Sequence, residues 1–362
     1  MVTTAFRLVV CDGDETGQEL LDEALRVLDP AVIGIELELE RFDLSLANRR
    51  RTHNAVVHEA AEAMRQAGFG LKAATITPEG ADDVGSPNRI LREGVGGSVI
   101  VRTGRRIPGV TPLAPVVHPI AVVRMAVGDA YGAEEWRDGT PGTPDESASR
   151  TERITRSSCR FVAEHAFRLA AAMRGEVYGG PKWTVSARYE ALLKEEMDTA
   201  ASRHPGVPYR PVLVDAAYAG LLSASDDRPL VVPALNRDGD CLSDLVLALF
   251  GSIAGAESVL LAFDADLEVT VAMAEAPHGT APSLAGKDVA NPMAMLLACA
   301  AVLDHAARHG GDAVADAGRA VRDATLAVAA AGTRTFDLGG SASTGEVVDA
   351  VVDAVASART AH

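Results

Sequence analysis

The sequence has few cysteines and few aromatic residues. Among 362 residues there are four cysteines, and aromatic residues make up 4%. Because no two cysteines have the CxxC spacing, neither a disulfide framework nor a thiolate zinc site is encoded. A reducing cytoplasm is therefore the expected compartment. The cysteines are Cys11, Cys159, Cys241 and Cys299.

Positive charge is also scarce. Lys plus Arg number 34 against 50 Asp plus Glu, which gives a formal net charge of −16. Because a phosphate backbone is bound by a clustered basic face, this balance argues against nucleic acid and against an acidic membrane surface as partners. With so few lysines, any lysine beside a motif is a candidate for a specific role. The lysines are Lys72, Lys182, Lys194 and Lys287.

Long hydrophobic runs are missing. No stretch approaches the ~20 apolar residues that span a bilayer. The opening MVTTAFRLVV lacks the basic region and the cleavage site of a signal peptide. We therefore expect a cytoplasmic protein without a membrane span. Hydrophobic residues still make up 48% of the chain, enough for one or two packed cores.

Strand-like and helix-like segments alternate along the chain. Residues 7–13 predict a buried strand, and residues 14–29 predict a helix with apolar residues at three-to-four spacing. A strand at 33–44, a helix at 52–68 and a strand at 70–77 follow. This alternation favours an α/β layered fold. Further strands are expected at 98–102, 119–129, 176–180, 211–215 and 229–235. Residues 132–152, rich in turn formers, predict an excursion or a small arm.

Several acids follow one apolar strand. Asp238, Asp240 and Asp244 lie in NRDGDCLSDLV at the start of a predicted helix, and Asp215 ends the strand expected at 211–215. Carboxylates at positions i and i+4 share one helical face, which suits a hard divalent cation. For any one of these acids, a role in a helix cap or a turn is the open alternative.

Three arginines lie at the rims of predicted strands or helices. Arg92, Arg102 and Arg124 together would suit a polyanionic small molecule, because arginine grips carboxylates bidentately. Taken singly, each could be a solvated surface charge. The nucleotide fingerprints are missing: the first strand is followed by DGDETG rather than GxGxxG, and APHGTAPSLAGK lacks P-loop spacing. An ordinary Rossmann or Walker site is therefore not expected.

Taken in order, these motifs resemble the β-decarboxylating dehydrogenase family of isocitrate, isopropylmalate and homoisocitrate dehydrogenases, over nearly the whole chain. FDLSLANR, HEAAEAMRQAG, LKAATITP and SPNRILREGVGG are similar to the dimeric NADP-type isocitrate dehydrogenases. NRDGDCLSDL, HGTAPSLAGKDVANP and DLGGSAST are more similar to isopropylmalate and NAD-type isocitrate enzymes.

The resemblance implies the α/β fold of that family, with two α/β domains and a cleft between them. Residues 1–97 and 251–362 would form the large domain, and residues 98–250 a small interface domain with an arm at about 132–152. The cleft would hold substrate, metal and nicotinamide. A homodimer with shared active sites is implied, because some functional residues would come from the partner subunit.

The resemblance also assigns roles in the oxidative decarboxylation of a 3-substituted malate. Asp240 and Asp244 would hold Mg²⁺ or Mn²⁺ with Asp215 of the partner subunit, and Asp238 matches a nearby acid of less certain role. Lys182 of the partner subunit would help remove the hydroxyl proton, and Tyr131 would act as general acid. The residues for the anionic hydroxy acid would be Thr77, Ser86, Asn88, Arg89, Arg92, Arg102 and Arg124.

The implied cofactor is NAD or NADP. After the HGT stretch, NADP enzymes of the family place Lys-Tyr or Arg-His, whereas NAD-using isopropylmalate enzymes place an acid. This chain has Ser283 and Leu284, which favours NAD because no cation is present for a 2′-phosphate. The implied cofactor residues are Thr75, Thr77, His278, Gly279, Thr280, Ala281, Ser283, and, near the adenine, Asn291 and Asp337.

Three departures set the chain apart from ordinary isocitrate dehydrogenases. Arg89 replaces the glycine of SPNG, Met125 replaces a histidine, and the arm is shorter. Because an extra arginine suits an anion with more charge than a carboxylate, 3-(phosphonomethyl)malate in a specialised biosynthetic pathway is a hypothesis beside isocitrate. Alternatively, Arg89 points to solvent or pairs with Asp82, Asp83 or Glu93. A non-catalytic, regulatory isocitrate dehydrogenase-like subunit is the second functional hypothesis.

Overall fold

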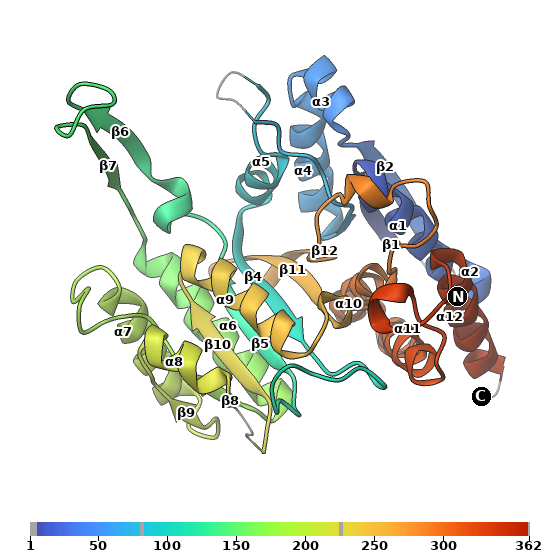
Figure 1. The fold of residues 1–362 in the computed structure, drawn as a ribbon. Helices are drawn as coiled ribbons and strands as arrows, with labels where there is room; N and C mark the ends of the chain where they lie inside the picture. The colour runs from blue at the N-terminus through green and yellow to red at the C-terminus, as the bar shows by residue number, and fades with distance from the viewer. Residues whose placement is uncertain (1–5, 80–82, 224–226, 361–362) are drawn as a thin grey trace.

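A mixed sheet of ten strands forms the centre of the structure, a computed structural model that describes residues 6–79, 83–223 and 227–360 (Figure 1). The strand order is β2-β1-β3-β12-β11-β4-β5-β10-β8-β9. The strands are β1 (Phe6–Asp12), β2 (Leu37–Asp43), β3 (Phe69–Lys72), β4 (Gly97–Gly104), β5 (Ile120–Met125), β8 (Glu176–Tyr178), β9 (Tyr209–Arg210), β10 (Leu230–Ala234), β11 (Glu257–Phe263) and β12 (Val269–Glu275).

Strand direction changes in the middle of this sheet. The pairs β12–β11, β11–β4 and β4–β5 are antiparallel, and the pairs on either side of them are parallel. The parallel pairs follow from helical crossovers, which place helices on both faces. The expected α/β class is thus confirmed.

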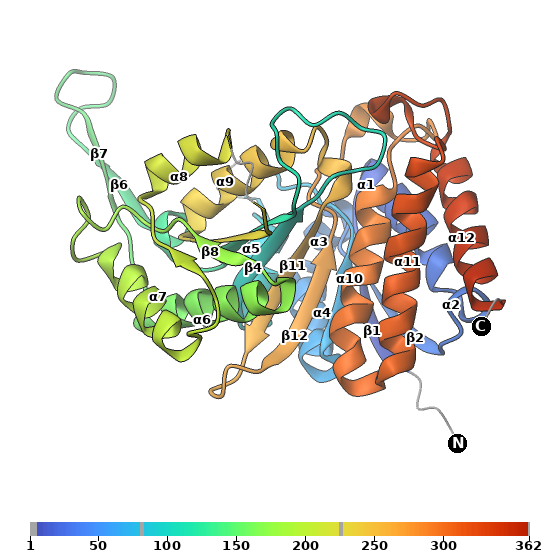
Figure 2. The same ribbon diagram turned by 90° about the horizontal axis from the view of Figure 1, so that it is seen from below.

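Helices cover both faces of the sheet. The helices α3, α4, α5 and α9 lie on one face, and α1, α6 and α10 lie on the other, as Figures 1 and 2 show. The bounds are α1 (Glu15–Leu25), α2 (Pro30–Ile33), α3 (Leu46–Thr52), α4 (Ala55–Ala67), α5 (Pro87–Gly94), α6 (Arg156–Met173), α7 (Ala191–Arg203), α8 (Val214–Leu221), α9 (Asn236–Leu249), α10 (Met293–Gly310), α11 (Asp312–Ala330) and α12 (Thr344–Thr360). Among the described residues, no helix is both long and apolar enough to cross a bilayer.

A hairpin projects from the body of the molecule. It consists of β6 (Glu134–Asp138) and β7 (Ser147–Thr151), and nearly all of its strand residues are exposed (Figure 1). Trp136, on β6, is 47% exposed. This hairpin lies within 132–152, where the sequence predicts an excursion or small arm. A lone two-stranded hairpin is at best marginally stable in water, so these two strands have no core of their own.

Three segments differ from the sequence expectation. The strand expected at 211–215 is wrong: Asp215 lies in the first turn of α8, because the helix-forming AAYAGLL that follows extends back to Val214. The strand expected at 70–77 ends at Lys72, and beyond it the Ala74 carbonyl accepts from the Asp14 backbone N–H at 2.9 Å. Strands β11 and β12 were not expected, although both lie in the middle of the sheet.

Candidate active site

Two arginines leave the same face of neighbouring strands. Arg102 on β4 pairs in register with Val122 on β5, two residues before Arg124, so both side chains project toward α9. Arg124 is buried, and its Nε and Nη2 donate to Asn236 Oδ1 at 3.0 and 2.8 Å. Its Nη1 donates to Asp240. The Arg102 and Arg124 guanidinium groups therefore meet the start of α9.

The N-terminal turns of α9 pack directly on Arg124. A Cβ atom on Gly239 would lie 2.7 Å from Arg124 Cβ, so only glycine permits this approach. Burial, with the nearby charges of Arg92 and Arg102, lowers the pKa of Arg124 to about 10, although Asp240 acts to raise it. The guanidinium therefore stays charged at pH 7. Arg92, on α5, thus belongs to the same cationic cluster.

Asp240 and Asp244 lie one helical turn apart on α9. Arg102 Nη1 is 3.1 Å from Asp244 Oδ1 and 3.6 Å from Asp240 Oδ1. Carboxylate oxygens at this spacing fit Mg²⁺ or Mn²⁺. Among the described residues, no third acid or histidine completes a metal-binding group. Asp238 pairs instead with Arg237 at 3.6 Å, and burial raises the pKa of its carboxyl.

Tyr131 reaches the same carboxylate. Its hydroxyl donates to Asp240 Oδ2 at 3.0 Å, and the Arg124 guanidinium lies 5.6 Å from its ring centroid. Partial burial and the negative charge of Asp240 raise the pKa of the Tyr131 phenol. The hydroxyl thus keeps its proton at neutral pH, as a proton donor must.

Asp129 positions the short turn that holds Tyr131. This buried residue has φ of 59°, a left-handed conformation that aspartate tolerates. Its carboxylate accepts hydrogen bonds from the Tyr189 hydroxyl and the Arg237 backbone N–H, both at 2.9 Å. One side chain therefore joins the Tyr131 turn to the start of α9 and to the segment before α7. This role could not be predicted from the sequence, because an aspartate in a Gly-Asp pair is typical of an ordinary turn.

Lys182 and Asp215 form a pair of their own. Lys182 Nζ donates to Asp215 Oδ2, and this hydrogen bond lowers the pKa of the Asp215 carboxyl. The Lys182 backbone N–H donates to Glu190. Neither Lys182 nor Asp215 makes a hydrogen bond or an ion pair with Asp240 or Asp244 among the described contacts. Within one chain, the expected metal ligands are therefore not all brought together.

A cavity of about 260 Å³ opens beside Tyr131. Ser86 and Arg89 line it together with Arg92. Arg89 is exposed, and among the described residues it forms no ion pair: Asp83 pairs with Arg50 instead, no pair with Glu93 is present, and Asp82 lies outside the described residues. The Oδ1 atom of Asn88 is buried without a hydrogen-bond partner. The remaining lining residues are Glu93, Ala126, Val127, Gly128, Gly132 and Asn236. Met125 is not among them, because it faces the core on the other side of β5.

The loop from His278 to Ser283 is held against the start of α1. The Thr16 backbone N–H donates to the Thr280 carbonyl at 3.1 Å, and its Oγ1 donates to the Ala281 carbonyl at 2.8 Å. His278 Nε2 and Thr75 Oγ1 are buried without partners, so both are available to a ligand. Burial lowers the pKa of His278, which favours the neutral imidazole. Gly279 and Thr77 are exposed.

The two residues expected near the adenine lie together. Asn291 Nδ2 donates to Asp337 Oδ2 at 3.0 Å. The neighbouring Phe336 is 86% exposed, so an aromatic face stands beside this pair. At the other end of the loop, Lys287 Nζ donates to the Ser283 carbonyl at 2.7 Å. No sequence motif indicated the position of Phe336.

Residues outside the expected set hold the segment that contains Thr75 and Thr77. Asp14 accepts the backbone N–H groups of Leu46 and Ile76, both at 2.9 Å. Gly13 lies so close to the Ala74 carbonyl that no Cβ atom would fit. The DGDETG segment thus holds Thr75 and Thr77 in place through the close approach of Gly13 to Ala74 and the hydrogen bonds that Asp14 accepts. A search for the GxGxxG motif does not detect this arrangement.

Arg49 holds the next part of this segment from within the protein. It is fully buried and donates to the carbonyl groups of Leu44, Ile76 and Gly85. In sequence it is one of three consecutive arginines, and nothing in that run distinguishes the buried member.

A buried ion pair lies beneath the site. Lys72 is 1% exposed, and its Nζ donates to Glu275 Oε2 at 3.1 Å and to the Ala73 carbonyl at 2.9 Å. Although burial acts to raise it, the pKa of Glu275 is lowered by the charges of Lys72, Arg92 and Arg102. The ends of β3 and β12 are thus joined just before Thr75 and His278.

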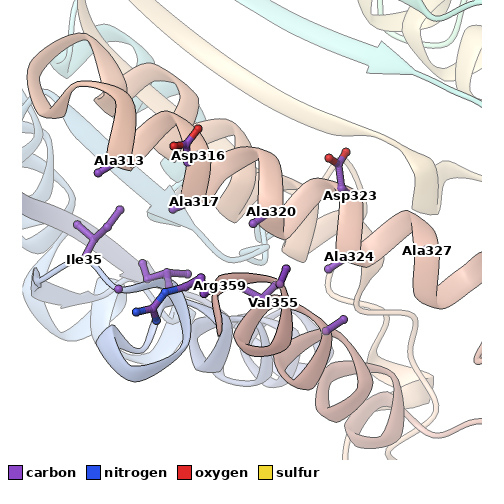
Figure 3. Close-up of a pocket in the computed structure, with 14 residues that line it drawn as sticks. Ile35, Ala313, Asp316, Ala317, Ala320, Asp323, Ala324, Ala327, Val355 and Arg359 are labelled. Atoms are coloured by element: carbon purple, nitrogen blue, oxygen red, sulfur yellow. The ribbon is translucent and has the colours of Figure 1, made fainter. Parts of the chain in front are cut away.

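A wider cavity, of about 830 Å³, lies away from these groups, between α11, α12 and α2 (Figure 3). Half of its lining residues are alanines, and Ile33, Ile35 and Val355 also line it. The Arg359 guanidinium is already bonded to the Ala31 and Val32 carbonyls. Without a convergent set of polar groups, this cavity is not the active site.

Comparison with known proteins decides the family. A family model described as isocitrate/isopropylmalate dehydrogenase matches residues 7–351. The chain belongs to that family. This confirms the resemblance and the enzyme class, an NAD(P)-dependent dehydrogenase. Metal dependence fits the same family.

Individual relatives of this family member differ in their substrates. It is 31% identical over 298 residues to the NADP isocitrate dehydrogenase of Thermus thermophilus, covering 82% of this chain but only 57% of that enzyme. It is 30% identical to the 3-isopropylmalate dehydrogenase of Methanothermobacter thermautotrophicus, over 95% of this chain and 96% of that one. The isocitrate/homoisocitrate dehydrogenase of Thermus thermophilus is 29% identical, with 98% and 99% covered.

Solved structures confirm the fold. The isocitrate dehydrogenase of Methylococcus capsulatus superposes with a TM-score of 0.83 at 22% identity, over 97% of this chain and 99% of that one. The TT0538 protein of Thermus thermophilus gives the same TM-score at 27% identity, over 98% and 69%. The isocitrate/isopropylmalate dehydrogenase-like fold is therefore present.

Proposed function

We propose that this family member oxidatively decarboxylates a 3-substituted malate whose substituent is an anion, with NAD as oxidant. The supporting observation is the cluster of Arg92, Arg102 and Arg124, which faces the same end of α9 as Tyr131. Three guanidinium groups that converge on one site suit a substrate with several carboxylates.

The reaction divides among residues of the site. The hydroxyl proton leaves toward Lys182 of the partner subunit while C2 transfers hydride to the nicotinamide. The C3 carboxylate then departs as CO₂, its bonding electrons pass into an enolate, and Tyr131 donates a proton to C3. The carboxylates Asp240 and Asp244 would hold Mg²⁺ or Mn²⁺, completed by Asp215 of the partner subunit. When bound, the cation supplies Lewis-acid stabilisation of the charge that develops on the C2 oxygen.

A homodimer with shared active sites accounts for two observations. The Lys182–Asp215 pair stands apart from Asp240 and Asp244 in one chain. The hairpin β6–β7 presents exposed strands, including Trp136, that a partner would cover. A dimer of two-fold symmetry would place both features against equivalent surfaces of a second copy.

Within this proposal, 3-(phosphonomethyl)malate is the substrate that the pocket favours. Arg89 lines the cavity beside Ser86 and Tyr131, and the described residues give it no counter-ion. A phosphonate carries more charge than a carboxylate and offers three acceptor oxygens. A free guanidinium in that place is therefore a better partner for phosphonate than for the carboxylate of isocitrate.

Substituting Arg89 tests this choice. We expect Arg89→Gly to lower kcat/KM for 3-(phosphonomethyl)malate by about 10- to 100-fold, because a charge-assisted contact of about 1.5–3 kcal/mol is lost. The value for isocitrate should change by less than about threefold. The measurement is reduction of NAD⁺ at 340 nm with Mg²⁺ or Mn²⁺. Arg106→Gly, an exposed arginine away from the cavity, is the control.

The same assay can contradict the substrate choice. Rapid wild-type turnover of isocitrate, with equal losses for both substrates in Arg89→Gly, would make Arg89 a surface residue and the enzyme an isocitrate dehydrogenase. Silence of the wild type with isocitrate, homoisocitrate, 3-isopropylmalate and the phosphonate would contradict the catalytic proposal itself.

The cofactor proposal is tested at Phe336. We expect Phe336→Ala to raise KM for NAD about five- to tenfold with little change in kcat, because a stacking surface of about 1–1.5 kcal/mol is removed from the adenine. Phe336→Tyr keeps the ring and should retain the wild-type KM. Initial rates against NAD⁺ concentration measure both, and the same rates with NADP⁺ decide the preferred nucleotide. An unchanged KM in Phe336→Ala would place the adenine elsewhere.

A further inference from the structure

A second polar cavity lies on the opposite face of the sheet from the catalytic side chains. It has a volume of about 280 Å³ and lies between α6 and α10. Both helices lie on the same face of the sheet, and in Figure 2 they are seen to the left and to the right of β11 and β12. Val101, Val259 and Leu261 contribute apolar strand side chains to its lining. None of the residues assigned to substrate, metal or nucleotide lines it.

Most of the charges around this cavity are already paired. The Arg322 guanidinium pairs with Asp304, and Glu257 accepts from Arg105 at 2.6 Å. Arg168 donates to the Leu267 carbonyl at 2.7 Å and lies 3.1 Å from a Glu268 carboxylate oxygen. Arg308, on α10, has no such partner among the described residues. The cavity therefore has one uncompensated positive charge at its wall.

Two histidines face into the same space from opposite helices. His165 comes from α6 and His305 from α10. Burial, with the positive charge of Arg308, lowers the pKa of His165 to about 3 and that of His305 to about 4. Both imidazoles are thus neutral at pH 7, and each has one N–H to donate. His305 Nδ1 is shielded from solvent and has no hydrogen-bond partner.

We propose that this cavity is a binding site for a small organic anion, whose oxyanion is held by Arg308, His305 and His165 and whose carbon body packs on the apolar strand side chains. A buried polar nitrogen without a partner is unfavourable, and a bound oxygen acceptor would satisfy it. A carboxylic acid fits better than inorganic phosphate, because much of the lining is apolar and gives a fully hydrated ion nothing to contact. This inference rests on the cavity alone and not on the proposed reaction.

An occupant would touch two helices from distant parts of the chain. Arg168 and His165 are on α6, whereas His305 and Arg308 are on α10. The antiparallel strands β4 and β11 beneath them hold Arg102 and Ser258 in register. An anion bound here would therefore bridge α6 and α10 on the reverse side of β4, the strand that holds Arg102, which makes it a candidate regulator of the enzyme.

The test must separate this cavity from the active site, which also binds anions. We would titrate the full-length Arg92→Gln/Arg102→Gln variant with succinate by isothermal titration calorimetry, and then repeat the titration after adding Arg308→Gln. We expect the first variant to bind about one succinate per chain, and Arg308→Gln to weaken that binding about tenfold, as expected when a charge-assisted hydrogen bond is lost. Arg106→Gln in place of Arg308→Gln is the control. Phosphate, titrated in parallel, should bind more weakly than succinate.

Each outcome decides the proposal. Because the experiment measures no turnover, it stands whatever reaction the enzyme performs. Binding that disappears with Arg92→Gln/Arg102→Gln alone would overturn the inference, since the active site would then be the one anion site. Equal binding with and without Arg308→Gln would also overturn it. Thermal unfolding of each variant verifies folding, and if Arg308→Gln fails to fold, His305→Asn replaces it with the same expected loss.

Discussion

A heterodimer of two inactive variants is expected to recover about half of the wild-type activity. Lys182→Met and Tyr131→Phe, each made alone, should lower kcat by about 10²- to 10⁴-fold, because each removes a proton-transfer group. In the heterodimer, one site combines both substitutions, but the other combines an intact Tyr131 with an intact Lys182 of the partner subunit. Co-expression with two different affinity tags and sequential purification isolates this species for rate measurement.

The reference sample is a heterodimer of wild type with the double variant Lys182→Met/Tyr131→Phe. There, each site contains one substituted residue, so shared sites predict almost no activity. Sites built within single chains predict the reverse: about half activity for this reference and almost none for the first heterodimer. The more active of the two heterodimers therefore shows whether each site is shared between subunits or built within one chain. A monomeric enzyme would contradict the proposal outright.

Breaking the buried pair beneath the site is expected to have the largest effect on stability. Lys72→Met should lower the free energy of unfolding by about 3–5 kcal/mol, because the Glu275 carboxylate stays in the interior without its ammonium partner. Adding Glu275→Gln should restore a large part of that loss, since the uncompensated charge is then gone. Urea unfolding at pH 7 measures all three proteins.

Arg319→Met provides the matched control for this measurement. Arg319 pairs with Asp316 on the same helix, and the two side chains are 61% and 65% exposed. Surface pairs of this kind contribute about 0–1 kcal/mol. If Lys72→Met destabilised the protein no more than Arg319→Met does, the buried pair would have no special role in holding β3 against β12.

Local sequence patterns predicted most strands of the sheet but missed β11 and β12. β1 and β2 and the helices around them follow clear periodicities and turn signals. β11 and β12 are apolar runs without alternation, and a short apolar run does not by itself distinguish a strand from a buried helical segment. The segment at 211–215 misled for another reason: its branched apolar residues favour a strand locally, but the helix that follows includes Val214 and Asp215.

Residues in recognisable motifs could be proposed from the sequence, and residues that act through the backbone could not. Asp240, Tyr131 and Arg124 meet in space as three separate motifs suggested. Arg49 and Asp129 remained hidden, because their importance comes from burial and from hydrogen bonds to backbone groups distant in sequence. Periodicity records which face of an element is apolar, but it does not record which buried polar group meets which amide.

The bond between Arg124 and Asp240 has a consequence for how ligands enter. The Arg124 guanidinium, which is buried, already has an anionic partner in Asp240, and Asp240 also accepts from the Tyr131 hydroxyl. If Arg124 binds a substrate carboxylate, as we propose, that carboxylate must replace Asp240, so binding at Arg124 would be an exchange of one anion for another. In the absence of substrate, the Asp240 carboxylate also offsets the repulsion between Arg124 and the neighbouring Arg92 and Arg102. Because Asp240 already neutralises part of this cluster, substrate affinity should depend less on ionic strength than it would for three arginines without a carboxylate partner.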